Sequence, residues 1–189
     1  MRDDFAVFIL THGRADNVVT MKTLRKHGYA GRWYMIIDDE DPTADAYREK
    51  FGADHVIQFC KQEAHDLADT MDNLNEHRAI LYARNESFRI ARELGLTYFL
   101  MLDDDYSDLL FRFPVGRSLQ SKSVCGENLE RVFNAMLAFL DTSGAATVAF
   151  AQGGDFIGGL AGGNFKKRLL RKAMNAFFCR ADRPIQFRG

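Results

Sequence analysis

Short apolar runs alternate with helix-length polar segments along the first hundred residues. Residues 5–10 (FAVFIL) form a continuous apolar run, which is typical of a strand covered on both faces of a parallel sheet. Similar runs predict further strands over 32–37, 55–59 and 96–102. Because helix-length segments separate these runs, the pattern predicts an α/β fold in which right-handed crossovers connect the strands of a mostly parallel sheet flanked by helices.

Three helices are predicted between these strands, over about 16–27, 43–51 and 75–94. Each is followed by a glycine, the residue that most readily adopts the left-handed conformation at a helix end. Residues 60–74 are charged, and they show no regular hydrophobic period. In the C-terminal half, a helix is predicted over 127–140 and another strand over 147–151.

A glycine-dense segment, residues 153–164, follows the last predicted strand. Glycines at this density permit unusual backbone angles and close approach of a ligand, and they also make a mobile loop. The segment matches no Walker A loop, because no Gly-Lys-Ser/Thr follows it. It also lacks the position of a dinucleotide fingerprint, which lies between the first strand and the first helix.

Polar residues follow three of the predicted strands, at 11–14, 38–41 and 103–105. In open α/β sheets, ligands bind at the carboxyl ends of the strands. The triplet Asp103-Asp104-Asp105 is the strongest of these signals, because three adjacent carboxylates repel one another unless water or a cation lies beside them. Mg²⁺ and Mn²⁺ prefer carboxylate oxygens, and phosphates often complete their coordination. The triplet therefore indicates either a metal and diphosphate site or a solvated acidic turn.

Composition adds expectations about domain number and location. A chain of 189 residues with 47% hydrophobic content suits one folded domain. Its three cysteines are far apart and show no CxxC spacing, which argues against structural zinc and fits a reducing cytoplasm. No secretory signal is evident and no apolar run approaches the length of a membrane span, so no membrane partner is expected.

Charge is balanced overall at −1, but it is distributed unevenly. From Gly153 onward, basic residues outnumber acidic ones, which fits a surface facing phosphate or DNA; a solvated basic helix face is the simpler interpretation. The basic residues of this tail are Lys166, Lys167, Arg168, Arg171, Lys172, Arg180, Arg183 and Arg188, against Asp155 and Asp182.

The segment Ala83-Arg84-Asn85, the helix after it and the run YFLMLDDD at 98–105 resemble the GT-A class of nucleotide-sugar glycosyltransferases. In that class a Rossmann-like sheet carries an Asp-any-Asp motif that binds a divalent metal and the donor diphosphate. The resemblance covers roughly residues 5–110. It implies a single GT-A domain over 1–189, with a nucleotide-sugar half over about 1–110 and an acceptor-side half over about 111–189.

A narrower resemblance is to the phage TET-associated glycosyltransferases, which are proposed to place sugars on hydroxymethylated bases of phage DNA. The segments that carry it are FILTHGR, HGYAGRWYMIIDDED, YARN and LGLTYFLMLDDDY. This resemblance implies a metal-dependent glycosyltransferase with Mn²⁺ or Mg²⁺ as cofactor. It also implies a nucleotide-sugar donor, with a UDP-sugar favoured, and an acceptor hydroxyl on modified DNA.

Carried across by motif, the resemblance implies that the metal is held by Asp103 and Asp105. It further implies that the nucleotide-sugar is contacted by Thr11, His12, Arg14, Asp38, Asp39, Arg84, Asp103 and Asp104. Simpler structural roles remain open for several of these residues: Arg14 in an ion pair with Asp16, Asp38 and Asp39 as caps of the following helix, and Arg84 in an ion pair with Glu76 or Glu93.

An inverting glycosyltransferase needs a general base that deprotonates the acceptor hydroxyl. In the resembled group this base is often one acid of a Glu-Asp pair after the acceptor loop, and no such pair follows here. Asp155 is the fallback candidate, and a domain lacking its C-terminal part is the simpler interpretation. Two alternatives therefore stay open: a nucleotidyltransferase of related architecture, and a non-catalytic domain that binds nucleotide-sugars.

Overall fold

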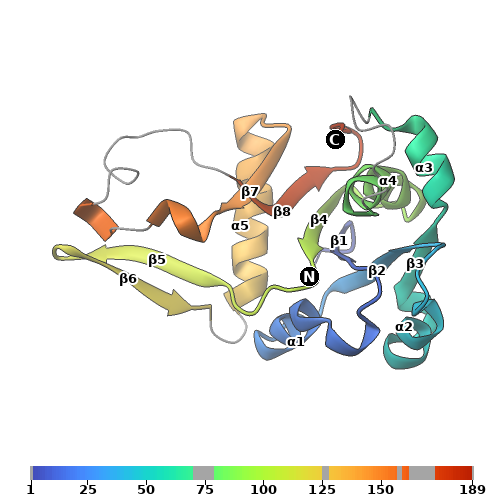
Figure 1. The fold of residues 1–189 in the computed structure, drawn as a ribbon. Helices are drawn as coiled ribbons and strands as arrows, with labels where there is room; N and C mark the ends of the chain where they lie inside the picture. The colour runs from blue at the N-terminus through green and yellow to red at the C-terminus, as the bar shows by residue number, and fades with distance from the viewer. Residues whose placement is uncertain (1, 70–78, 125–127, 157–158, 162–172, 189) are drawn as a thin grey trace.

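A six-stranded sheet forms the centre of the computed structural model, which describes residues 2–69, 79–124, 128–156, 159–161 and 173–188 (Figure 1). The strand order is β3-β2-β1-β4-β8-β7. The first four strands in this order pair in parallel, and β8 runs antiparallel to both of its neighbours. The strands are β1 (Phe5–Leu10), β2 (Arg32–Asp38), β3 (Val56–Phe59), β4 (Tyr98–Asp103), β7 (Thr147–Ala151) and β8 (Ala173–Arg180).

Helices cover both faces of this sheet. On one face lie α1 (Val19–Lys26), α2 (Ala44–Phe51) and α5 (Asn128–Ser143), and on the other lie α3 (Lys61–Leu67) and α4 (Ala79–Glu93). Strand β1 explains the division, because Phe5, Val7 and Ile9 pack toward the first group of helices while its alternate side chains pack toward α3 and α4. All six β1 residues are buried, as a central parallel strand requires.

These observations confirm the predicted α/β class, with a mostly parallel sheet flanked by helices as expected for a GT-A, Rossmann-like fold. The glycines predicted to end helices also do so, since Gly28, Gly52 and Gly95 have φ angles of 71°, 94° and 67°. Within the described part of the chain, no helix has the length and apolar character needed to cross a bilayer.

Several boundaries differ from the predictions. The first helix begins at Val19 rather than near residue 16, because a separate 3-10 turn, η1 (Ala15–Asn17), precedes it. Helix α3 occupies part of the stretch 60–74 that showed no period. The predicted helix 75–94 is present as α4 from Ala79 onward, and residues 75–78 lie outside the described residues. Most of the basic residues of the predicted tail, at 166–172, also lie outside them.

Strand β8 and a two-stranded antiparallel hairpin were not predicted. The hairpin consists of β5 (Leu110–Val115) and β6 (Ser118–Ser123), and it extends away from the central sheet (Figure 1). Two short 3-10 helices, η3 (Gly153–Phe156) and η4 (Gly159–Ala161), lie in the glycine-dense segment, and another, η2 (Ala53–His55), precedes β3. The hairpin lacks an alternating hydrophobic pattern because all six residues of β5 are exposed.

Candidate functional site

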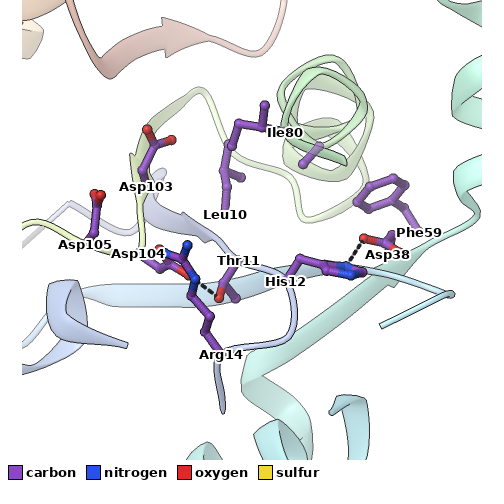
Figure 2. A pocket seen from close by; sticks show the side chains of 11 residues that line it. Leu10, Thr11, His12, Arg14, Asp38, Phe59, Ile80, Asp103, Asp104 and Asp105 are labelled. Atoms are coloured by element: carbon purple, nitrogen blue, oxygen red, sulfur yellow. Dashed lines mark hydrogen bonds and ion pairs between the residues drawn. The ribbon is translucent and has the colours of Figure 1, made fainter. Parts of the chain in front are cut away.

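A cavity of about 260 Å³ lies where the parallel strands end (Figure 2). The last residues of β1, β2, β3 and β4 contribute to its wall. The N-terminal part of the crossover helix α4 and the polar turns that follow β1 and β4 complete it. Its lining residues are Leu10, Thr11, His12, Arg14, Asp38, Phe59, Ile80, Ala83, Asp103, Asp104 and Asp105. The structure therefore brings six of the predicted nucleotide-sugar residues, and both predicted metal ligands, to one cavity.

The carboxylate of Asp104 is buried and accepts hydrogen bonds from two residues of the first loop. Thr11 Oγ1 donates to it over 2.7 Å, and the Arg14 guanidinium lies 3.1 Å away. Since the Thr11 hydroxyl has only one proton, the Tyr47 hydroxyl donates to Thr11 over 2.7 Å, and it accepts from the Arg14 backbone N–H over 2.9 Å. Asp104 thus holds the loop after β1, and Arg14 pairs with it rather than with Asp16.

His12 and Asp38 pair across the floor of the cavity. The imidazole Nδ1 of His12 lies 2.7 Å from Asp38 Oδ2, and the Asp38 carboxylate is buried (Figure 2). The nearby Asp41 is also buried: it accepts from the Gly13 backbone N–H over 2.9 Å and from the Thr43 backbone N–H over 2.7 Å. Asp41 therefore fixes the first loop against the start of α2, a role that the sequence analysis did not assign.

Asp39 does not line the cavity. Its carboxylate accepts a 2.9 Å hydrogen bond from the backbone N–H of Lys61, the first residue of α3, and this bond holds the pKa of Asp39 below its usual value. Asp39 therefore caps a helix, which was the simpler structural role left open for it. The helix that it caps is α3, whereas the expected one was α2, the next helix along the chain. Of the two predicted acidic residues at the end of β2, only Asp38 lines the cavity as the structure describes it.

Asp103 and Asp105 extend to the same side at the end of β4, as expected for residues two positions apart (Figure 2). Burial raises the pKa of Asp103, and the Arg84 guanidinium, 3.2 Å from its carboxylate, opposes that shift. Asp105 is exposed, and none of the described residues forms a hydrogen bond or an ion pair with it. Its oxygens are therefore available to a ligand from solution.

Helix α1 holds the turn that carries these carboxylates. The Thr20 hydroxyl donates to the Asp103 carbonyl over 2.6 Å and accepts from the Tyr106 N–H over 2.9 Å. One turn later, the Thr23 hydroxyl donates to the Tyr106 carbonyl over 2.7 Å. These two threonines satisfy backbone groups that the turn leaves unpaired, and so they fix the positions of Asp103 and Asp105. Sequence reasoning missed them, although their spacing of three places both on one helix face.

The residues of the Ala83-Arg84-Asn85 motif have separate roles. Asn85 exchanges two hydrogen bonds, of 2.9 and 3.1 Å, with the backbone of Phe187 and so fixes the C-terminal segment against α4. The Arg84 guanidinium lies beside the paired rings of Phe177 and Phe187, 5.8 and 5.7 Å from their centroids. Its Nε is buried, and no acceptor within the described chain reaches it. Arg84 therefore pairs with Asp103 rather than with Glu93, and its other predicted partner, Glu76, lies outside the described residues.

The donor set around Asp103 and Asp105 suits a hard divalent cation that shares its coordination with a ligand. No group of three or more His, Cys, Asp or Glu side chains able to hold a metal ion occurs among the described residues. Mg²⁺, however, is usually bound through one or two carboxylates together with substrate phosphates and water. The carboxylates of Asp103 and Asp105 match this arrangement, in which the protein supplies two ligands and the substrate and water supply the rest.

Asp155 lies in η3. Its neighbours Gly153 and Phe156 line a second cavity, which is described below. The side chain of Asp155 falls outside the described residues, so its role as general base stays a prediction.

Comparison with known proteins identifies the family. A family model described as TET-Associated Glycosyltransferase matches residues 5–189, almost the whole chain. No curated protein matches the chain. The family match indicates a glycosyltransferase, and it decides against the nucleotidyltransferase alternative.

Proposed function

Because the chain belongs to the TET-associated glycosyltransferase family, we propose that it transfers a sugar from a UDP-sugar to the hydroxyl of a hydroxymethylated base in DNA, with Mn²⁺ or Mg²⁺ as cofactor. The observation that carries this proposal is that the carboxylates of Asp103 and Asp105 both line the cavity at the end of β4. The cavity is large enough for part of a nucleotide. The family membership supports the reaction class, while the cavity supports the donor and the metal.

The charge of the cavity favours a metal. Four carboxylates line it, those of Asp38, Asp103, Asp104 and Asp105, whereas Arg14 is the one arginine or lysine among the described residues of the lining. A diphosphate approaching this wall would be repelled unless a divalent cation lay between the two. When bound, such a cation would stabilise the negative charge that develops on the departing diphosphate.

The protein's own residues supply the remaining interactions with the donor. In the proposed complex Asp38, which bonds to His12, accepts hydrogen bonds from the base or the ribose. The apolar side chains of Leu10, Phe59 and Ile80 line the same cavity. The unused, buried Nε of Arg84 is a donor suited to an anionic group such as a phosphate. Asp104 and Thr11 act indirectly, because they hold the loop that carries His12 and Arg14.

In the proposed reaction the acceptor oxygen bonds to the anomeric carbon, and the bond between that carbon and the diphosphate oxygen breaks. The hydroxyl proton passes to a general base, for which Asp155 remains the candidate. Asp155→Asn is expected to reduce transfer strongly while leaving UDP affinity close to that of the wild type. A retained transfer rate would eliminate Asp155 as the base.

Two measurements test the proposal as a whole. Calorimetry with UDP, UDP-glucose and ATP, each with and without Mn²⁺, is expected to show metal-dependent binding of the uridine nucleotides in preference to ATP. Incubation with UDP-glucose and DNA containing 5-hydroxymethylcytosine, followed by mass spectrometry of the nucleosides, is expected to show hexose addition, and unmodified cytosine DNA is the control. Metal-independent UDP binding would contradict the cofactor assignment, and failure of transfer from every UDP-sugar would contradict the acceptor.

A further inference from the structure

The β5–β6 hairpin exposes more apolar surface than a free-standing ribbon normally does. Leu110, Phe111, Phe113 and Val115 retain 47, 46, 38 and 44% of their accessible surface. Large apolar side chains that gather on one exposed element mark a contact surface more often than they occur by chance. The hairpin thus has the character of a binding element.

The charge of the hairpin is entirely positive. Between residues 109 and 124 the chain contains Arg112, Arg117 and Lys122, and it contains no aspartate or glutamate. The strand register places Lys122 opposite Phe111, so that a cation lies beside an aromatic ring on one face of the ribbon. The Arg112 guanidinium lies on the other face, 5.0 Å from the centroid of the Phe156 ring. Cations interleaved with aromatic rings are the features by which proteins bind polynucleotides, through phosphate contacts and base stacking.

A second cavity, of about 410 Å³, opens where the hairpin meets the α/β body. Its wall comes from the start of β5, from α5 and from the segment between β7 and η3, and most of its exposed surface is apolar. The aromatic members of this lining are Tyr106, Phe111, Phe150 and Phe156. A cavity of this size and character can hold a planar aromatic ring, such as a nucleobase, in stacking contact.

The two cavities adjoin the same short segment of chain. Asp103, Asp104 and Asp105 line the first cavity, while Tyr106 and Asp108 line the second. A group held in the second cavity would therefore meet a sugar held in the first at the turn that follows β4. This adjacency is what transfer from a donor to an acceptor requires.

The root of the hairpin is rigidly held beside that turn. The Asp108 carboxylate lies 2.8 Å from the imidazole Nε2 of buried His27, and it accepts hydrogen bonds of 2.7 Å from the Ser123 hydroxyl and 2.8 Å from the Leu109 N–H. The Val124 N–H donates to the Leu109 carbonyl over 2.9 Å and closes the two strands. A ligand on the hairpin would thus be positioned relative to the carboxylates at 103 and 105.

From these observations we infer that the hairpin and the second cavity form the acceptor surface for DNA, with the target base turned out of the duplex into the cavity. The inference rests on the proposed function, since it assigns the location of that function's acceptor. A base stacked inside a duplex cannot reach an enclosed active site, so enzymes that modify bases extrude them. Arg112, Arg117 and Lys122 then contact backbone phosphates, because the width of the major groove admits a two-stranded ribbon.

Charge removal tests the phosphate contacts. The variant Arg112→Gln/Arg117→Gln/Lys122→Gln is compared with the matched variant Lys22→Gln/Arg25→Gln/Arg183→Gln, which removes three exposed cations from other parts of the molecule. The probe is a fluorescent duplex with one 5-hydroxymethylcytosine, measured by anisotropy at several salt concentrations. The hairpin variant is expected to reduce the slope of log affinity against log salt by about 2 to 3, and the matched variant to leave it close to the wild-type value. UDP affinity, measured by calorimetry, is expected to be equal in all three proteins.

The variant Phe111→Ala tests the base contact, and because Phe111 is half exposed it is expected to fold normally. Loss of one stacking contact is expected to reduce transfer to DNA by about 5- to 100-fold, with UDP affinity unchanged. The same measurement on Phe139→Ala, which truncates an exposed phenylalanine of α5, is the control and is expected to match the wild type.

The outcomes separate this inference from the function on which it rests. If the wild type transfers sugar to DNA and the hairpin variants bind and transfer equally well, the inference is wrong and the proposed function stands. If the wild type modifies no DNA, the proposed acceptor is wrong and the inference falls with it. If sedimentation shows that Phe111→Ala converts a dimer to a monomer without any change in DNA binding, the hairpin is a self-association surface and the inference is overturned.

Discussion

The Arg84 guanidinium lies 3.2 Å from the carboxylate of Asp103, and together they join the crossover helix α4 to the end of β4. Both side chains are largely shielded from water, with 14 and 22% of their side-chain surface exposed. A charge pair in such surroundings is screened much less than a surface pair, so the Arg84 charge opposes the rise that burial causes in the pKa of Asp103. The proposed donor site therefore depends on residues that are separated by a whole helix in sequence.

Arg84→Gln is expected to weaken UDP binding in the presence of Mn²⁺. The substitution removes the charge that favours the ionised form of Asp103, along with the buried Nε donor, and losing a hydrogen bond to a charged group costs about 1.5–3 kcal/mol, or roughly 10- to 100-fold in affinity. Calorimetry measures the effect. Arg89→Gln, on the same helix but in an exposed pair with Glu86, is the control; equal affinities in the two variants would exclude a role for Arg84 in the site.

Asp105→Asn is expected to remove the metal dependence of UDP binding. Asp105 presents exposed oxygens that no described residue engages, and an amide replaces one of them with a donor that cannot coordinate a cation. A metal contributes several kcal/mol to such interactions, so affinity in Mn²⁺ is expected to fall by about 100-fold or more, while affinity in EDTA stays the same. Asp54→Asn, an exposed carboxylate of η2, serves for comparison. A preserved Mn²⁺ effect in Asp105→Asn would refute the assignment.

Thr11→Val is expected to lower the free energy of unfolding by about 1–3 kcal/mol, because it removes the hydroxyl that connects buried Asp104 to Tyr47 and leaves polar groups without a partner. Urea denaturation measures the change. In Thr142→Val, where the hydroxyl bonds only to the backbone of an exposed helix end, a change within about 0.5 kcal/mol is expected. Similar values for the two variants would show that the Thr11 network does not stabilise the fold.

The Asp108 carboxylate is expected to make stability depend on pH in the acid range. Burial acts to raise its pKa, but hydrogen bonds from Ser123, Leu109 and His27 outweigh burial and hold that pKa below its usual value. Its contribution to stability is therefore complete above the unfolded-state pKa, about 3.9, and is lost as pH falls through the lower pKa of the folded protein. In Asp108→Asn, melting temperature is expected to fall less steeply than in the wild type below about pH 4.

Melting curves between pH 3 and 7 measure this difference. Asp54→Asn, which removes an exposed carboxylate of η2, is expected to follow the wild-type curve. Parallel curves for Asp108→Asn and the wild type would show that the Asp108 contacts do not stabilise the native state.

The sequence predicted the strands of the donor half well because each is a buried apolar run that ends at a polar turn. The positions of Thr11, Asp38 and Asp103 follow directly from this, since parallel strands place their carboxyl ends together. The partners of these residues could not be predicted in the same way. Tyr47 and Thr20 lie on helices whose periodicity indicates which face is buried, but not which loop that face meets.

Strand β8, the β5–β6 hairpin and the position of Asp39 were not predicted, each for its own physical reason. The strand β8 follows residues 162–172 in the chain but lies between β4 and β7 in the sheet, and this insertion depends on long-range pairing that no local pattern records. The hairpin β5–β6 is exposed, so it lacks the alternation that burial imposes on strands. The resemblance implied a nucleotide contact for both Asp38 and Asp39, whereas successive side chains at a strand end point in opposite directions.

The hydrogen bond between Val124 and Leu109 means that the hairpin leaves the α/β body and returns to it at one point. An element attached in this way can be lengthened, shortened or exchanged without moving either end, because loop length changes the closure free energy only slowly. On the inference that the hairpin binds the acceptor, its exchange changes acceptor preference while the strands that carry Asp103 and Asp38 remain the same. Grafting the residue 110–123 segment from one family member onto another is then a direct route to enzymes with altered targets.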